Sequence, residues 1–186
     1  FNVTATTESY AAFYARPVRD ALPISTGASS PPAASPEERA KLWEARHNVL
    51  YATIASRPGC KAWTSDVCVP IAHVAECIVE TQQDLAASHL VAPLVGHAGD
   101  GNFHLIFMLD PDDPDELARV AAANHRLVER ALKFGGTCTG EHGVGVGKLK
   151  YLEQEHGPEA LELMRTIKRA VDPRNLMNPG KLVPGV

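Results

Sequence analysis

Hydrophobic residues recur at three- and four-residue spacing in several parts of the chain, which is the period of an amphipathic helix. The clearest helix start is Ser35-Pro36-Glu37-Glu38, a capping box in which Ser35 is the N-cap and Glu38 lies three residues later. Glycine pairs and Asp-Pro steps are typical helix ends. The pattern predicts helices over about 35–56, from Pro70, from Asp115 to Gly135, and from near Pro158 to Asp172.

Short β-rich runs lie between the predicted helices. The segments 91–95 and 103–109 are predicted to form an antiparallel hairpin, with alternate residues from His104 on one face and from Phe103 on the other. The runs 64–69 and 137–139 are further candidate strands. This mixture predicts an α+β fold in which helices pack on an antiparallel sheet.

The chain divides into two parts by composition. Residues 1–34 are poorly patterned and rich in Ser, Thr, Ala and Pro, so we expect an N-terminal segment or linker that buries no face. Residues 35–186 are expected to form one domain. No apolar stretch reaches the roughly 20 residues that a transmembrane helix needs. Because the chain begins with Phe1, we expect it to be a piece of a longer product.

Charge and cysteine content exclude some classes of function. The 186 residues carry a formal net charge of −4 with mixed signs and no long basic run, which argues against a nucleic-acid partner. None of the four cysteines forms a CxxC pair, which argues against a zinc site built from thiolates. We expect all four thiols to be reduced.

Two glycine-framed segments carry the candidate chemistry. Gly96–His104 places His97 and His104 on either side of a tight turn, and Glu141 and His142 lie together between glycines some forty residues later. Two imidazoles and one carboxylate that leave coordination positions open are typical of a catalytic metal site. The pattern therefore indicates His97, His104 and Glu141 as metal ligands, with His142 beside them. Solvated histidines at an ordinary turn remain the alternative interpretation.

Two further motifs need interpretation. Gly143–Lys148 resembles a phosphate-binding loop, but the first glycine of that motif is missing and Leu149 replaces the required Ser or Thr, so nucleotide binding of that kind is excluded. Arg46 lies on the apolar side of the first predicted helix. Either its methylenes follow the surface to water, or it pairs with a buried anion.

With these motifs the chain resembles a known family, the FAD-linked oxidases with a vanillyl-alcohol-oxidase-type flavin domain, and in particular their C-terminal substrate domain. The resemblance covers about residues 28–182, while residues 1–27 do not match. It is carried by the runs Leu42–Asn48, Ser65–Pro70, Gly96–His104, Gly136–Gly143 and Asn178–Lys181.

The resemblance implies a role for each candidate residue. His97, His104 and Glu141 match positions that bind a divalent metal, which we expect to be Zn or Mn. His142 matches the catalytic base, which also contacts the substrate, and Arg46 matches the arginine that binds the substrate carboxylate. Asn178 matches a stretch close to the flavin. FAD itself is held mainly by a domain that precedes this one in the family, so we expect these 186 residues alone not to retain it.

The resemblance also implies a reaction, which is the oxidation of a D-2-hydroxy acid to the 2-oxo acid. The amino-acid sequences of these runs most resemble those of family members that pass electrons from D-lactate to cytochrome c in mitochondria. The places that hold a second carboxylate in relatives acting on 2-hydroxyglutarate correspond to Leu50, Thr64 and Ile106, none of which is cationic. We therefore expect a small monocarboxylic substrate, D-lactate first.

Several alternatives stay open. Within the family, the chain could belong to a D-2-hydroxyglutarate dehydrogenase or a glycolate oxidase subunit. Outside it, the same two-histidine, one-carboxylate set would serve a metal-dependent hydrolase or a non-haem iron enzyme. A catalytically silent fragment is the third alternative. The oligomeric state is not fixed by the sequence, and a homodimer is one of the states that it allows.

Overall fold

The computed structural model describes residues 35–183 and 185, so the segment predicted as a linker, 1–34, lies outside the described residues. Within helix α2 and the turn after β3 a few side chains are also outside the description, namely those of Glu38, Arg39, Lys41, Leu42, Trp43, Ala45, Arg46 and Ala98. The described part is a mixture of helices and an antiparallel sheet, which confirms the predicted α+β class.

Each of the four predicted helices corresponds to an α-helix among the described residues, and two of them start elsewhere than predicted. The segment after Pro70 begins with a 3₁₀ turn before the α-helix. The last helix begins earlier than predicted and bends at Gly157, whose φ of 80° and ψ of 162° are not helical, so that Pro158 opens its second leg. The helices are α2 (Pro36–Ala55), η4 (Ile71–His73), α3 (Val74–Ala87), η5 (Ala98–Asp100), α4 (Pro114–Lys133), η6 (Leu149–Tyr151) and α5 (Leu152–Val171).

Strand β4 (Asn102–Leu109) is the centre of the sheet and pairs antiparallel with each of the other three described strands. These are β1 (Lys61–Thr64), β2 (Val67–Cys68) and β3 (Leu94–His97). The predicted hairpin is confirmed as β3–β4, although its first strand lies further along the chain than 91–95. The prediction of a strand at 137–139 is wrong, because this segment makes only an isolated bridge, between Thr137 and Cys68.

Strands β1 and β2 follow the same edge of β4 in one continuous register. Thr64 lies opposite Ile106, and Val67 lies opposite Phe103. The two residues between the strands therefore continue this alignment, which brings Asp66 opposite His104. Side chains directly opposite each other on adjacent strands share a face of the sheet.

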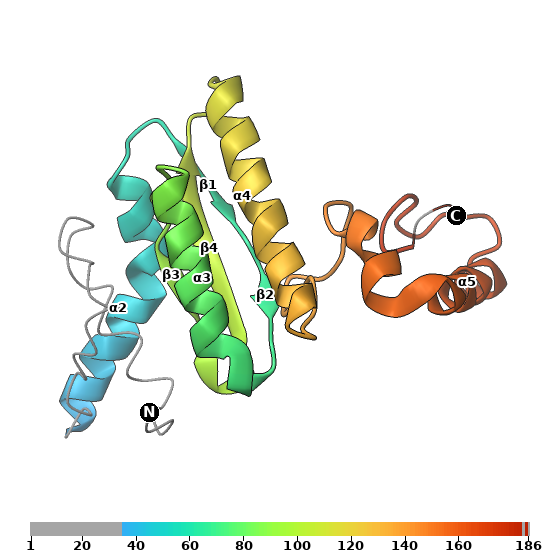
Figure 1. Cartoon of the computed structure of the whole chain (residues 1–186), viewed down its shortest axis with the longest axis horizontal. Coiled ribbons are helices and arrows are strands. Elements are labelled where there is room, and N and C mark those ends of the chain that lie inside the picture. Colours follow the sequence, from blue (N-terminus) through green and yellow to red (C-terminus); the bar gives the residue numbers. More distant parts are fainter. Residues whose placement is uncertain (1–34, 184, 186) are drawn as a thin grey trace.

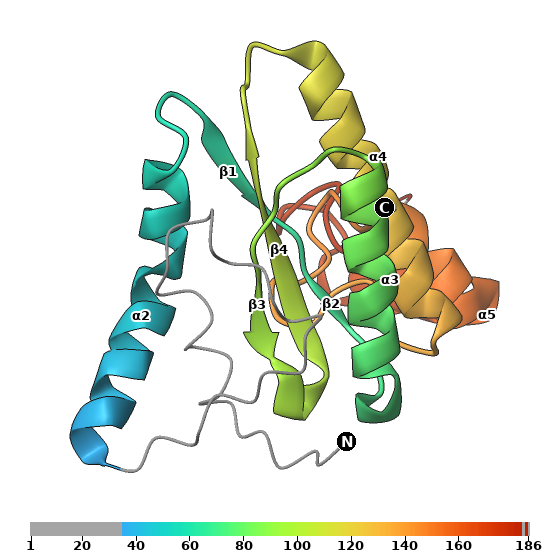
Figure 2. The ribbon, with the colours of Figure 1, turned by 60° about the vertical axis from the view of Figure 1, so that its left-hand side comes forward.

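The helices form layers on the two faces of this sheet (Figures 1 and 2). Phe103, Leu105 and Phe107 belong to the main core, which also contains buried residues of α3 and α4 such as Leu127. Ile106 and Val95 form a smaller cluster with Val49 of α2. Helix α2 therefore covers the face of the sheet that carries His104, and α3 and α4 cover the opposite face. Leu117 of α4 lies one turn before the buried Val120 and, by helical spacing, would be expected to face inward, but it is 43% exposed.

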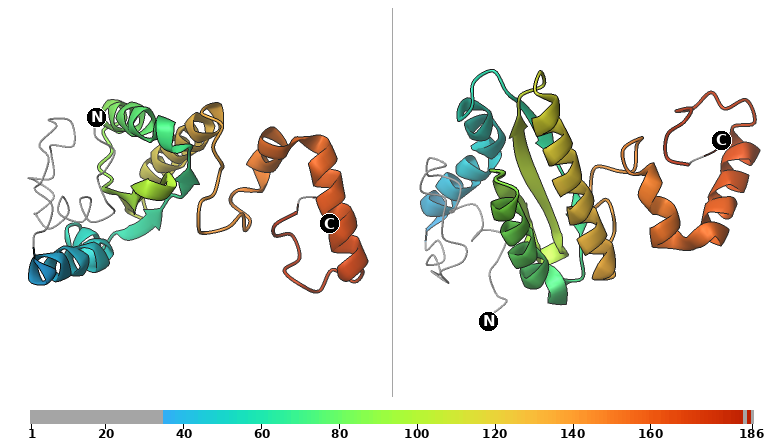
Figure 3. Two further views of the ribbon diagram at one scale, coloured as in Figure 1. Left: turned by 90° about the horizontal axis from the view of Figure 1, so that it is seen from below. Right: turned by 45° about the horizontal axis from the view of Figure 1, so that its top comes forward.

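Helix α5 lies beyond α4, away from the sheet (Figures 1 and 3). Tyr151, Leu152 and Leu161 are buried and connect this part to the main core. In the tail that follows, the amide of Leu182 donates to the carbonyl of Gly145, 3.1 Å away. Among the described residues, no helix combines the length and the apolar character that crossing a membrane requires.

Candidate functional site

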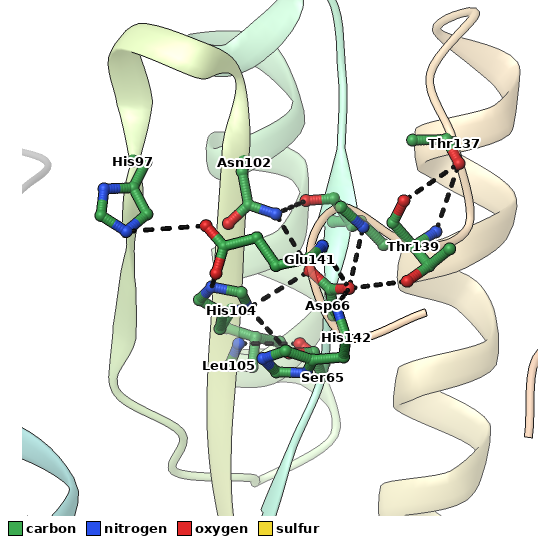
Figure 4. Close-up of polar contacts among 12 residues, drawn as sticks. Ser65, Asp66, His97, Asn102, His104, Leu105, Thr137, Thr139, Glu141 and His142 are labelled. Atoms are coloured by element: carbon green, nitrogen blue, oxygen red, sulfur yellow. Dashed lines mark hydrogen bonds and ion pairs between the residues drawn. The ribbon is translucent and has the colours of Figure 1, made fainter. Parts of the chain in front are cut away.

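The carboxylate of Glu141 lies between the imidazoles of His97 and His104 (Figure 4). One oxygen is 3.6 Å from Nε2 of His97, and the other is 3.7 Å from Nε2 of His104. The hairpin brings the two histidines together from β3 and β4, while Glu141 lies on the loop that follows α4. The structure therefore brings together the three residues that the sequence indicated as ligands.

His104 is oriented by the segment opposite it. Its Nδ1 lies 3.1 Å from the carbonyl oxygen of Ser65, and a carbonyl only accepts, so we assign the proton to Nδ1. The lone pair of Nε2 then points toward Glu141. Burial lowers the pKa of His104, although the Ser65 carbonyl and Asp66 partly offset it. A neutral imidazole with a free Nε2 is the form that ligates a metal.

His142 lies beside these groups. Its ring is parallel to that of His104, with centroids 4.8 Å apart and an interplanar angle of 5°. The residue is exposed, whereas His104 is 5% exposed. The fourth group indicated by the sequence is thus adjacent to His104 and accessible to a small molecule.

Asp66 is the functional candidate that the sequence did not indicate. It is 1% exposed, and its two oxygens accept five hydrogen bonds, from the side chains of Asn102 and Thr139 and from the amides of Gly140, Glu141 and His142. Burial alone would raise the pKa of Asp66, but the donated hydrogen bonds outweigh burial and lower the pKa to about 2. The signal available in the sequence was a carboxylate inside a β-rich apolar run.

Two carboxylates could therefore complete a metal site with His104. Ligand atoms of Asp66, His104 and His142 lie within 4.8 Å of one another, and among the described residues His97 is not part of that compact group. However, the oxygens of Asp66 are already engaged by five donors, whereas the side chain of Glu141 is 47% exposed. Glu141 is thus the carboxylate better able to take a cation.

The spacing of these atoms fits a shared cation. A carboxylate oxygen and a ring nitrogen that presents its lone pair approach each other favourably when a cation lies between them, so separations of 3.6 and 3.7 Å are compatible with a shared metal ion. Two ligands of one tetrahedral ion with ~2.1 Å bonds are about 3.4 Å apart. Donor type and separation therefore suit a divalent ion at His97, Glu141 and His104.

Close packing explains one of the glycines that frame the site. A Cβ on Gly140 would lie 1.7 Å from Nδ2 of Asn102 and 3.0 Å from Oδ1 of Asp66. No side chain fits there unless the Asn102 side chain or the loop moves. The glycine is needed for close approach of the backbone, as expected for residues framing a ligand site.

Two predicted residues are less closely defined. Arg46 belongs to α2, on the helix that covers the His104 face, but its side chain lies outside the described residues. Asn178 is exposed and has a positive φ of 49°. The tail that carries it lies beside α5, away from the β3–β4 hairpin (Figure 1).

Comparison with known proteins decides the family. Residues 17–182 match the model of the FAD linked oxidases, C-terminal domain. The chain belongs to this FAD-linked oxidase family. The match corrects the expectation that residues 1–27 lie outside the family for residues 17–27 only, since it begins at residue 17.

The relatives of this FAD-linked oxidase domain include mitochondrial enzymes. It is 54% identical over 147 residues to a probable mitochondrial D-lactate dehydrogenase of Danio rerio, covering 79% of this chain and 30% of that protein. It is 49% identical over 152 residues to the mitochondrial D-lactate dehydrogenase [cytochrome] of Arabidopsis thaliana, covering 82% of this chain and 27% of that protein. The chain thus spans less than a third of these two relatives.

A solved structure supports the fold of this FAD-linked oxidase domain. The 4-ethylphenol oxidase from Gulosibacter chungangensis, in complex with isoeugenol, superposes with a TM-score of 0.56 at 15% sequence identity. The superposition covers 83% of this chain and 32% of the oxidase chain. At that identity the likeness establishes the fold alone, and it agrees with the predicted α+β architecture.

Proposed function

We propose that this chain is the substrate-handling domain of an FAD-dependent D-2-hydroxy acid dehydrogenase that oxidises D-lactate to pyruvate in mitochondria and passes the electrons to cytochrome c. The names of its relatives support the substrate, the acceptor and the compartment. The observation that carries the proposal is the meeting of Glu141 with His97 and His104 beside the accessible ring of His142.

In this proposal His97, His104 and Glu141 hold a divalent ion, Zn or Mn, because two imidazoles and one carboxylate suit either metal. A bound divalent ion supplies Lewis acidity, which lowers the pKa of a hydroxyl group that coordinates it. Burial of His104 keeps its imidazole neutral, and the Ser65 carbonyl fixes which nitrogen is available.

The remaining residues handle the substrate. His142 accepts the proton of the 2-hydroxyl group, for which its exposed position next to His104 is suitable. Arg46, on the helix that covers this face, binds the substrate carboxylate through two parallel hydrogen bonds. FAD, which we expect to be bound mainly outside this chain, would supply the oxidant for removal of the hydride from C2 of the substrate. The Asn178 segment is proposed to approach the flavin.

The positions around the site favour a substrate without a second charge. Thr64 and Ile106 are direct neighbours across β1 and β4, and Ile106 is 2% exposed in the cluster that it forms with Val49 and Val95. Leu50, the third position, follows Val49 on α2. Leu50 is 37% exposed, but burying a second carboxylate against Ile106 without a cation is costly. D-lactate therefore fits better than D-2-hydroxyglutarate.

The test uses the full-length protein that contains this chain, with dye reduction as the readout. We expect kcat/KM for D-lactate to exceed that for glycolate and for D-2-hydroxyglutarate, and metal analysis to find Zn or Mn. Glu141→Gln should lose the metal and the activity together, whereas Glu153→Gln, at an exposed position of α5, should keep both.

Each part of the proposal can fail separately. A preference for the diacid would contradict the substrate assignment, and full activity in metal-free protein would contradict the role of the three ligands. Metal-dependent ester or peptide cleavage without flavin would instead support the hydrolase alternative.

A further inference from the structure

Asp66 is a buried carboxylate that takes no part in the proposed chemistry, yet it contacts most of the residues that do. Its Oδ2 accepts hydrogen bonds from the amides of Gly140, Glu141 and His142 at 2.8, 2.9 and 2.8 Å. The hydroxyl of Thr139 donates to the same oxygen at 2.8 Å. Three consecutive amides thus converge on one anion, the arrangement of a backbone anion nest.

This nest takes the place of regular secondary structure. Residues 139–143 lie in no helix or strand, so no ladder of backbone hydrogen bonds fixes their conformation. The backbone amides of Glu141 and His142 themselves are instead held by the Asp66 carboxylate. Because these hydrogen bonds go to a charged acceptor, they are stronger than ordinary loop contacts.

The other oxygen of Asp66 reaches the hairpin. Oδ1 accepts from Nδ2 of Asn102 at 2.9 Å and lies 3.4 Å from Nδ1 of His104. The Ser65 carbonyl, 3.1 Å from the same nitrogen, favours the same tautomer. One side chain therefore connects the loop that carries Glu141 and His142 with the strand that carries His104 (Figure 4).

The side chain of Lys148 also attaches this loop to the segment that contains Asp66. Nζ of Lys148 donates to the backbone carbonyl of Asp66, at 2.7 Å, and to that of Cys138. The loop is consequently attached to the Asp66 segment by both the side chain and the backbone of Asp66. This double attachment explains how an irregular, partly exposed loop presents its side chains in a defined direction.

We propose that Asp66 is the positioning residue of this site: its buried carboxylate holds Glu141 and His142 against His104 and, together with the Ser65 carbonyl, keeps the proton of His104 on Nδ1. The inference deepens the proposed function, on which its metal and proton-transfer consequences rest. Asp66 itself acts through these residues and touches no reacting atom.

The first test is Asp66→Asn, measured by amide hydrogen exchange on the 186-residue chain. The substitution preserves the shape of the side chain while it removes the negative charge. Loss of the charged acceptor should raise exchange at Gly140, Glu141 and His142 about tenfold or more, without change at β4. The matched control is Asp112→Asn, which removes the same charge at an exposed position.

Two further readouts separate positioning from a general loss of stability. The ¹⁵N shifts of the His104 ring should show the Nε2–H form gaining population in Asp66→Asn. Binding of Zn²⁺ or Mn²⁺ to the chain should weaken about 10- to 100-fold, the usual effect of removing a group that orients a metal ligand. Neither change is expected for Asp112→Asn.

The outcomes distinguish this inference from the proposed function. Unchanged exchange and an unchanged His104 tautomer in Asp66→Asn would overturn it, whether or not the wild-type chain binds metal. If the wild type binds no metal but exchange and tautomer change as expected, the metal site fails and the positioning role stands. If Asp66→Asn does not fold, Thr139→Val, which removes one donor, should raise exchange about threefold; no change there would overturn the inference equally.

Discussion

The ring of His142 lies flat against that of His104, with centroids 4.8 Å apart and planes within 5°. One ring belongs to the buried strand β4, and the other to an exposed loop. The stacking fixes where the accessible imidazole stands relative to the buried one. It also allows the packing function of His142 to be separated from its chemical function.

His142→Phe should preserve the stacking but remove both ring nitrogens. In the full-length protein we expect D-lactate oxidation to fall by about 100-fold or more, the contribution typical of a general base. The melting temperature should change little, because an aromatic ring still covers His104. The control is His156→Phe on α5, an exposed imidazole outside the site. Equal activity in His142→Phe and wild type would remove His142 from the reaction.

Leu127→Ala should destabilise the domain, because Leu127 is fully buried in the core between the sheet and α4. We expect a loss of about 2–5 kcal/mol in the free energy of unfolding, measured by urea denaturation. Leu163→Ala removes the same atoms from a side chain that is 62% exposed and should cost less than about 0.5 kcal/mol. Similar losses in the two variants would contradict the assignment of the core.

Gly140→Ala should displace the loop that carries Glu141, because the added methyl group would lie 1.7 Å from Nδ2 of Asn102. We expect weaker Zn²⁺ binding, measured by isothermal titration calorimetry. Gly99→Ala is the matched control, since nothing lies within 4 Å of a Cβ at that position and its φ is not in the left-handed region. If Gly140→Ala binds Zn²⁺ as tightly as Gly99→Ala does, the close approach has no consequence for the site.

Asp172 should make the C-terminal tail sensitive to acid. The hydrogen bond from Lys168 and those from the amides of Leu176 and Met177 lower the pKa of Asp172 to about 2. A lowered folded-state pKa contributes stability above the unfolded value near 4, and this stability is lost as the pH falls from about 4 to about 2. Amide protection at Leu176 and Met177 should therefore decline in that range.

Asp172→Asn should have weaker protection at neutral pH and little further loss between pH 4 and pH 2. The comparison is with Asp112→Asn, which removes an exposed carboxylate and should behave as the wild type does. A wild-type-like acid response in Asp172→Asn would assign the effect to other carboxylates.

The part of the site that is local in sequence could be predicted. His97 and His104 flank one turn, and alternation along a strand identifies which residues share the face of His104. The position of Asp66 could not be obtained in the same way, because it depends on which strand pairs with β4 and in which register. A periodic pattern shows that a segment is a strand but carries no information about its partner.

Errors in the helices and strands have similar physical causes. Residues 137–139 have a strand-like composition, yet a single bridge to Cys68 replaces a ladder, since a buried carboxylate rather than a strand holds the next residues. Leu117 fits helical spacing, but the buried side of α4 is centred on Val120 and Leu127, which leaves Leu117 at its flank. Tertiary contacts decide such positions, and one-dimensional spacing does not.

The hydrogen bond between the amide of Glu141 and Asp66 joins residues 75 positions apart in the chain. The hairpin that carries His97 and His104 closes over only a few residues, so it can form early during folding. The loop that carries Glu141 can reach its place only after α4 has folded back along the sheet. An unfinished chain thus holds two histidines without their carboxylate, and completion of the site coincides with completion of the fold.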